Sequence, residues 1–225
     1  MNNFDFVPFL VSFELATWVT VILLVAVFPL AWVFGRSKRG WMPFVEALCS
    51  VGLVLPPTVL GFYLLVAFSP NNFIGAFFLK TFGFRIAFSF PGMVVAASIA
   101  GLPFMLSALR AGSSSVPQNL LEASWTLGKS RAATVVRVGV PNMKGAILAG
   151  VVTTFAHTLG EFGVVLMIGG SIPGVTKVVS VAIYEQWEAG NDMQAHLYAV
   201  VLLVISYAGV LAMNLAQRRE SRGRA

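Results

Sequence analysis

Five stretches of the sequence are each long enough and apolar enough to cross a lipid bilayer as a helix. A helix rises about 1.5 Å per residue, so a hydrocarbon core roughly 30 Å thick takes about 20 residues. The five stretches are residues 15–34, 47–68, 91–109, 145–168 and 197–216. With 57% hydrophobic and 11% charged residues, the chain also has too little polar surface for a soluble domain. These features predict an all-α membrane protein with about five transmembrane helices.

The distribution of basic residues predicts how the helices are oriented, because cytoplasmic loops carry an excess of Lys and Arg. The chain starts MNNFDFVPF, without the basic start of a secretory signal, and its first apolar stretch is followed by basic residues. We therefore expect this stretch to remain as a helix with its N-terminus outside and the C-terminus of the chain inside. The residues then placed inside are Arg36, Lys38, Arg39, Arg110, Lys129, Arg131, Arg137, Lys144, Arg218, Arg219, Arg222 and Arg224. Those placed outside are Lys80, Arg85 and Lys177.

Several functional classes have little support. The net charge of +6 is explained by the cytoplasmic loops, so no nucleic-acid partner is expected. Cys49 is the single cysteine, and zinc-protease and serine-hydrolase motifs are absent, so we expect no metal, no cofactor and no enzyme activity. The run Gly128-Lys129-Ser130 is similar to the end of a nucleotide-binding Walker loop, but Ala123 stands where its first glycine is needed. A channel or secondary transporter is disfavoured because neither internal repeats nor charges within the span cores are visible.

Two loops predicted to lie outside have room for short helices. Residues 69–90 begin with turn-forming Pro and Asn residues, and residues 169–196 begin Gly-Gly-Ser-Ile-Pro-Gly. Within the second loop, residues 180–187 are apolar enough for the interface but too few to span. We expect a re-entrant or surface piece there.

The long cytoplasmic loop, residues 110–144, contains signals for a short helix. Ser115 and Gln118 have the spacing of a capping box, and Gly128 is a natural helix stop, so a helix over residues 116–127 is predicted. An apolar stripe along this helix indicates that it lies in a groove, either of a partner or of its own chain. The stripe consists of Leu120, Leu121, Ser124 and Leu127.

The rest of this loop reads Glu122-Ala123-Ser124, three residues, Gly128, nine residues, then Val-Gly-Val-Pro at residues 138–141. This spacing resembles the EAA signature of ABC importer permeases. The resemblance implies a single transmembrane permease domain over residues 1–225, in which residues 113–142 form a cytoplasmic coupling loop. In that family the EAA helix docks in a cleft of a separate ATPase subunit. By this resemblance Ala123 and Gly128 permit close approach and Glu122 fixes a polar contact.

Further motifs are Val-Leu-Pro-Pro-Thr-Val-Leu-Gly at residues 54–61, Leu-Gly-Glu-Phe-Gly at 159–163, Ser-Ile-Pro-Gly at 171–174 and Thr176-Lys177. Together they resemble the molybdate permeases over nearly the whole chain. Sulfate permeases share Gly-Glu-Phe-Gly but are usually longer. The resemblance implies a homodimer in the bacterial cytoplasmic (inner) membrane, in contact with membrane lipid, two ABC ATPase subunits and a periplasmic oxyanion-binding protein. Alternating access would import molybdate, with tungstate, sulfate and thiosulfate as alternative cargoes.

The residues that we expect along the translocation path lie in the second and fourth stretches. Pro56 and Pro57 must interrupt helix hydrogen bonding, either beside the path or as a simple bend. The hydroxyls of Thr58 and Thr154 offer weak hydrogen bonds along it, although Thr in a membrane helix more often bonds its own backbone or a neighbouring helix. None of the five cores carries Lys or Arg, so a dianion would pass without being held tightly.

His157 and Glu161 lie four residues apart, on one helix face near the outer interface. A carboxylate would repel an oxyanion, so a hydrogen-bonded gate is the functional interpretation and plain interfacial exposure the alternative. Small residues also repeat four apart in the fourth stretch and suit close packing in a homodimer. The repeating pairs are Gly145 with Ala149 and Ala146 with Gly150.

Overall fold

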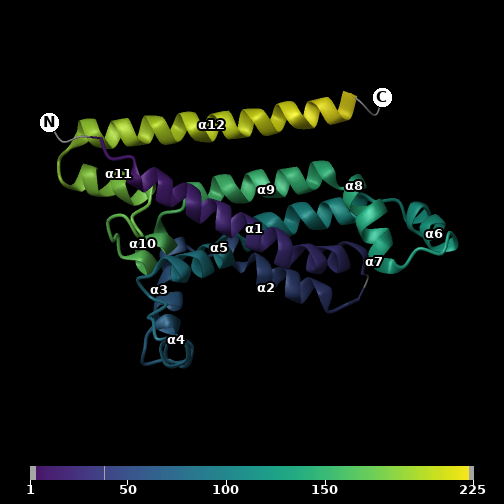
Figure 1. The fold of residues 1–225 in the computed structure, drawn as a ribbon, viewed down its shortest axis with the longest axis horizontal. Helices are drawn as coiled ribbons and strands as arrows, with labels where there is room; N and C mark the ends of the chain where they lie inside the picture. The colour runs from purple at the N-terminus through teal and green to yellow at the C-terminus, as the bar shows by residue number, and fades with distance from the viewer. Residues whose placement is uncertain (1–3, 38, 223–225) are drawn as a thin grey trace.

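The computed structural model describes residues 4–37 and 39–222, with side chains described up to residue 215. Lys38 and Arg224, both assigned to the cytoplasmic side, lie outside the described residues. All secondary-structure elements of the described residues are helices (Figure 1). These are α1 (Val7–Arg36), α2 (Met42–Val54), α3 (Pro57–Phe68), α4 (Phe73–Phe82), α5 (Phe90–Ser115), α6 (Gln118–Thr126), α7 (Arg131–Thr134), the π-helical turn η1 (Val135–Gly139), α8 (Val140–Asn142), α9 (Lys144–Leu159), α10 (Gly163–Gly169), α11 (Val179–Glu188) and α12 (Asp192–Arg222).

Three single helices, α1, α5 and α12, are long and apolar enough to cross a membrane. They contain the first, third and fifth predicted stretches, which are confirmed as helical. Two bent helix pairs raise the number of spans to as many as five: α2 with α3, at an angle of 109°, and the Arg131–Asn142 segment with α9, at 75°. The all-α membrane fold of three to five spans is therefore confirmed.

The interruption expected at Pro56 and Pro57 in the second stretch is observed, whereas the fourth stretch was wrongly predicted as one continuous helix. The second stretch breaks between Val54 and Pro57, because proline at 56 and 57 supplies no backbone donor for the preceding turn. The fourth breaks between Leu159 and Gly163, where Phe162 leaves helical geometry at φ −122°. This second break contains no proline. The apolar composition of the stretch therefore gave no sign of it.

The core is built on α1, which packs along both α5 and α9. Buried α1 residues recur every fourth position along one stripe, as expected for a helix pressed against neighbours. They are Leu15, Val19, Leu23, Val27 and Ala31. On α5, Gly101 lets the helices approach closely, since a Cβ there would lie 3.3 Å from Leu23 Cδ1. By contrast, only 6% of the apolar window of α12 is buried, which leaves its surface for lipid or another chain.

Different helices gather at the two ends of the molecule (Figure 1). One end carries the start of α1 together with α4, α10 and α11, and the other carries α6, α7 and α8. Helices α4 and α11 confirm the two short helices predicted in residues 69–90 and 169–196, and α6 confirms the short helix predicted in the loop. Near the α6 end, Arg110 Nε of α5 lies 2.8 Å from Glu46 Oε1 of α2. This ion pair ties the two helices together.

Candidate coupling loop and gate

The base of α6 is held by the end of α1. Arg36, the last residue of α1, donates from Nη1 to the carbonyl oxygens of Ser113 (2.9 Å) and Val116 (3.2 Å), and from Nη2 to Gln118 Oε1 (2.6 Å). The predicted capping box is wrong, because Ser115 Oγ donates to the Gly112 carbonyl and α6 has no side-chain cap. Ser115 instead closes α5, and Arg36 satisfies the carbonyls at the α5–α6 junction.

The faces of α6 divide differently from the predicted stripe. Leu121 is 2% exposed and packs with Val116 and Met143, whereas Leu120 is 42% and Leu127 80% exposed. Successive helix residues are about 100° apart, so Leu120 and Leu121 lie at opposite edges of the predicted stripe and one can be buried while the other faces outward. The single stripe was wrong: one part of it packs on the chain itself and the other faces outward.

Four of the five predicted coupling residues lie on the outer surface. Glu122, Ala123, Gly128 and Pro141 are exposed. Ser124 is buried, and its Oγ lies 2.9 Å from Thr134 Oγ1. Because the Thr134 hydroxyl donates to the Ser130 carbonyl at 3.0 Å, Ser124 is the donor of this pair. Ser124 therefore joins α6 to α7, while its neighbours Glu122 and Ala123 stay exposed.

Gly128 ends the helix as predicted. Its φ of +76° lies in the left-handed region that L side chains rarely adopt. Its N–H donates to the Trp125 carbonyl at 2.9 Å, and Lys129 N donates to the Ser124 carbonyl at 3.1 Å. No atom lies within 4 Å of a Cβ placed on Gly128. The backbone conformation, not the available space, calls for glycine here.

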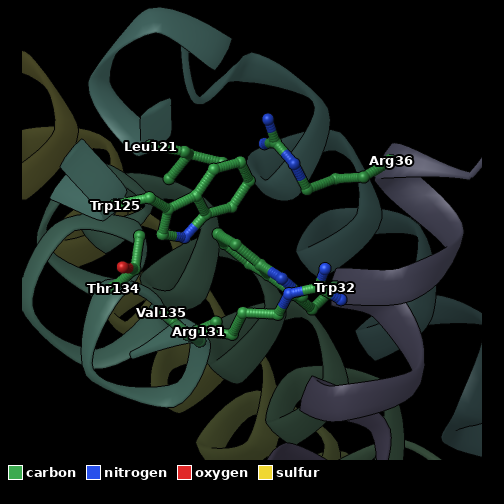
Figure 2. A pocket seen from close by; sticks show the side chains of 7 residues that line it. All are labelled: Trp32, Arg36, Leu121, Trp125, Arg131, Thr134 and Val135. Carbon is green, nitrogen blue, oxygen red and sulfur yellow. The ribbon is translucent and has the colours of Figure 1, made fainter. Parts of the chain in front are cut away.

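A cavity of about 280 Å³ separates α6 from the end of α1 (Figure 2). In Figure 2 Trp125 and Leu121 reach into it from α6, and Trp32 and Arg131 lie across from them. The Arg36 guanidinium carbon lies 5.3 Å from the centre of the Trp32 ring. The lining is completed by Thr134 and Val135. In the sequence analysis Arg36 served only to predict the orientation of the transmembrane helices, and Trp32 was given no role. Nothing in the neighbouring sequence indicates that either residue contacts a loop almost 80 positions away.

The two helix breaks meet at the end of the molecule opposite to α6. They line an open pocket of about 350 Å³ that brings together Pro57, Thr58, His157 and Glu161, four of the six predicted path residues. Pro56 directly precedes α3 as its N-cap residue. The cavity is also lined by Gly160, Phe162 and Gly163. The breaks thus form one site from two distant segments.

Glu161 is buried, with 6% of its surface exposed. Its Oε1 accepts from Val164 N at 3.3 Å, and its carbonyl accepts from Ser180 Oγ at 2.6 Å. His157 Nε2 lies 3.3 Å from Glu161 Oε2, and the His157 ring stacks on Phe104 with centroids 4.2 Å apart. The carboxylate of Glu161 therefore accepts from the start of α10 and faces His157 of α9, while its backbone carbonyl accepts from Ser180 of α11. This burial disfavours plain interfacial exposure.

Thr154 lies deeper in α9 and is fully buried. Its Oγ1 has no hydrogen-bond partner in the described part of the chain, while its carbonyl accepts from Thr158 Oγ1 at 2.9 Å. Thr58 is exposed at the cavity. Of the two threonines, only Thr58 contributes to the wall where the breaks meet.

One small-residue face of α9 packs inside the chain. A Cβ on Gly112 of α5 would lie 2.5 Å from Ala146 Cβ, and one on Gly150 would lie 3.1 Å from Met105 Sδ. The face of Ala146 and Gly150 is therefore used against α5. The expectation that this face serves a second copy is wrong.

A helix bundle with broken helices at one end and a projecting short helix at the other is the arrangement of a membrane-embedded transport subunit. The family described as "Binding-protein-dependent transport system inner membrane component" matches residues 6–222. The chain belongs to this family of ABC importer permeases, which are not themselves enzymes. It is a multi-pass protein of the inner membrane.

Similar proteins include permeases named for molybdenum transport and for sulfate transport. The molybdenum transport system permease protein ModB of Azotobacter vinelandii is 36% identical over 97% of this chain and 96% of its own length. The putative molybdenum transport system permease protein YvgM of Bacillus subtilis is 32% identical, covering 90% and 89%. A probable sulfate transport system permease protein of Chlorella vulgaris is 29% identical, covering 93% and 78%.

Solved structures share the fold at low sequence identity. An inward-facing MetNI methionine ABC transporter has a TM-score of 0.68 at 17% identity, covering 95% of this chain and 93% of that one. A bacterial alginate ABC transporter has a TM-score of 0.71 at 17% identity, covering 94% and 79%. These likenesses establish the importer-permease fold.

Proposed function

We propose that this chain is the permease subunit of an ATP-driven importer that carries molybdate into the cytoplasm by alternating access. The observation that carries the proposal is the 36% identity to the Azotobacter vinelandii molybdenum permease over nearly the full length of both chains. The probable sulfate permease is less similar and leaves more of its own length unmatched. Sulfate or thiosulfate is the second candidate cargo, and tungstate is almost isosteric with molybdate.

The coupling loop over residues 113–142 would receive the motion of two ATPase subunits. Its exposed surface includes Glu122, Ala123 and Gly128, flanked by the apolar side chains of Leu120 and Leu127. A polar residue among exposed apolar side chains suits a partner cleft that excludes water. Pro141 is exposed at the far end of the loop and completes this surface. ATP binding would draw the two loops together, and hydrolysis would release them.

The cavity where the helix breaks meet would form part of the translocation path. Pro56, Pro57 and Thr58 are exposed on the isolated chain, so a second copy is needed to enclose a pore beside them. Irregular backbone at membrane depth is tolerated where it lines a cavity. Glu161 would hold the break in shape from its buried position rather than bind the anion, because two negative charges repel.

A periplasmic binding protein would deliver the anion to the end that carries α4 and α11. One alginate transporter of this fold was solved in complex with a pentasaccharide-bound periplasmic protein. A soluble donor would account for selectivity in a permease whose cores contain no cation to hold a dianion. The permease then needs only weak contacts along the path.

Uptake of labelled molybdate tests the proposal. Cells lacking this gene would be compared with cells in which it is restored together with its ATPase and binding protein, with excess sulfate present. We expect restored, ATP-dependent uptake that sulfate barely inhibits and that Gly128→Arg abolishes. Strong inhibition by sulfate would indicate that the cargo is sulfate or thiosulfate instead. No ATP-dependent uptake of either anion would overturn the importer assignment.

A further inference from the structure

We infer that Arg36 is a positioning residue that locks the first transmembrane helix to the coupling loop, so that α1 and α6 move as one body. The inference rests on the proposed function and adds a residue outside the EAA segment to the transmission of motion. It starts from the three hydrogen bonds that Arg36 donates across the α5–α6 junction. A planar guanidinium can hold several acceptors in fixed directions, which a single ammonium cannot.

The first step is a continuous polar connection from α1 to the outer surface of α6. Arg36 Nη2 donates to Gln118 Oε1 at 2.6 Å, and Gln118 Nε2 donates to Glu122 Oε1 at 3.1 Å. Glu122 is exposed on the surface expected to meet the ATPase. Displacement of Glu122 therefore acts on Arg36 through one intervening side chain.

The second step is that serines of α5 hold the end of α1 in return. Ser113 Oγ donates to the Trp32 carbonyl and Ser114 Oγ to the Gly35 carbonyl, each at 3.0 Å. A Cβ on Gly35 would lie 2.7 Å from the Arg110 carbonyl, so the two helix ends are in direct contact. The Gly35 carbonyl belongs to the last turn of α1, where carbonyls lack partners within the helix, and Ser114 supplies its donor.

The third step is that α1 also touches the far side of the loop. A Cβ on Gly139 of η1 would lie 2.5 Å from Trp32 Cη2. The last turn of α1 therefore contacts the loop before α6 and again after it. At its other end, α1 reaches α11, where Ser12 Oγ accepts from Val179 N at 2.8 Å. A helix fixed at both ends can carry displacement of α6 across the membrane.

The first test measures anion uptake and ATP hydrolysis together in proteoliposomes holding the complete importer. Loss of folded protein lowers both rates in proportion, whereas loss of the lock lowers uptake per ATP hydrolysed. We expect Arg36→Gln to reduce this ratio about tenfold and Gln118→Ala about threefold, while the exposed neighbour variant Arg39→Gln leaves it unchanged. The double variant of Arg36 and Gln118 should be no worse than Arg36→Gln, since both act on one connection.

Arg36→Lys should restore only part of the ratio, because one ammonium cannot hold all three acceptors. Equal ratios for Arg36→Gln, Arg39→Gln and the unchanged protein would overturn the inference. The ratio is measured with whichever anion the importer carries, so a different cargo does not affect this conclusion.

The second test needs no transport. Spin labels at Asn119→Cys on α6 and Val25→Cys on α1, both exposed positions, would be placed in a Cys49→Ser background of the purified permease. We expect a narrow distance distribution that broadens with Arg36→Gln. A distribution that stays narrow would overturn the lock even if the permease proved to carry no molybdate.

Discussion

Gly163 and Pro57 bring the two helix breaks into direct contact. A Cβ on Gly163 would lie 2.8 Å from Pro57 Cβ and 3.1 Å from the backbone nitrogen of Thr58. Contacts below 3.0 Å are essentially never seen for a real Cβ atom. The start of α10 can therefore rest on the start of α3 only because residue 163 has no side chain.

Replacing Gly163 by Ala should separate the two breaks. Overpacking a close contact typically costs about 1–3 kcal/mol, and Pro57 cannot move aside because its ring is part of the backbone. We expect a lower melting temperature for the purified permease and loss of most uptake. Gly160→Ala is the matched control, since its nearest neighbour is a carbonyl of its own helix at 3.7 Å. Equal behaviour of the two variants would contradict the contact.

Substitutions at two adjacent residues of α6 should have different effects, one on stability and the other on uptake. Ser124→Ala removes a buried hydrogen bond to Thr134, so the free energy of unfolding should fall by about 1 kcal/mol while uptake stays near normal. Ala123→Trp changes an exposed residue, so the melting temperature should hold while uptake falls about tenfold, equivalent to about 1.4 kcal/mol of lost partner contact. Calorimetry of the purified protein and uptake by cells measure the two effects. The reverse pattern would show that the assignment of faces on α6 is wrong.

The straight spans and the loop helix could be predicted because their signals are local. Long apolar stretches marked α1, α5 and α12, and Gly128 marked the end of α6. The break within residues 47–68 was also signalled, since Pro56 and Pro57 lack the donors that a continuous helix needs. In each case the decisive chemistry lies within a few positions along the chain.

The rest depended on contacts between distant segments. The break after Leu159 contains no proline, and its shape depends on Glu161 bonding to Val164 and to Ser180 of another helix. Leu121 is buried and Leu120 is exposed because Leu121 packs with Met143, and the position of Met143 is set by the fold. Arg36 was visible as a basic residue after a span, but its acceptors lie in residues 113–118. Periodicity alone does not supply such pairings.

Substitutions at Gly128 should be ranked by their tolerance of a positive φ. The space around the residue is open, so side-chain size is not the constraint within the chain. Gly128→Asn should keep most uptake because Asn adopts the left-handed region more readily than other residues. Gly128→Val should cost roughly 1–2 kcal/mol at the end of α6 and weaken copurification of the ATPase subunit. If both variants copurify equally, the backbone of Gly128 does not set the geometry of the coupling surface.

Two substitutions at Glu161 should distinguish its role as a cap of α10 from a role of its negative charge. Glu161→Gln keeps an oxygen that can accept from Val164 N, so α10 should remain capped and the melting temperature should change little. Glu161→Ala leaves this donor without its partner in a buried position, and the lost cap should cost about 1–2 kcal/mol. Uptake should therefore survive in Glu161→Gln and be lost in Glu161→Ala, measured in cells with matched amounts of permease in the membrane. If Glu161→Gln also loses uptake at an unchanged melting temperature, then the charge facing His157 3.3 Å away operates the gate, and the cap alone does not explain the residue.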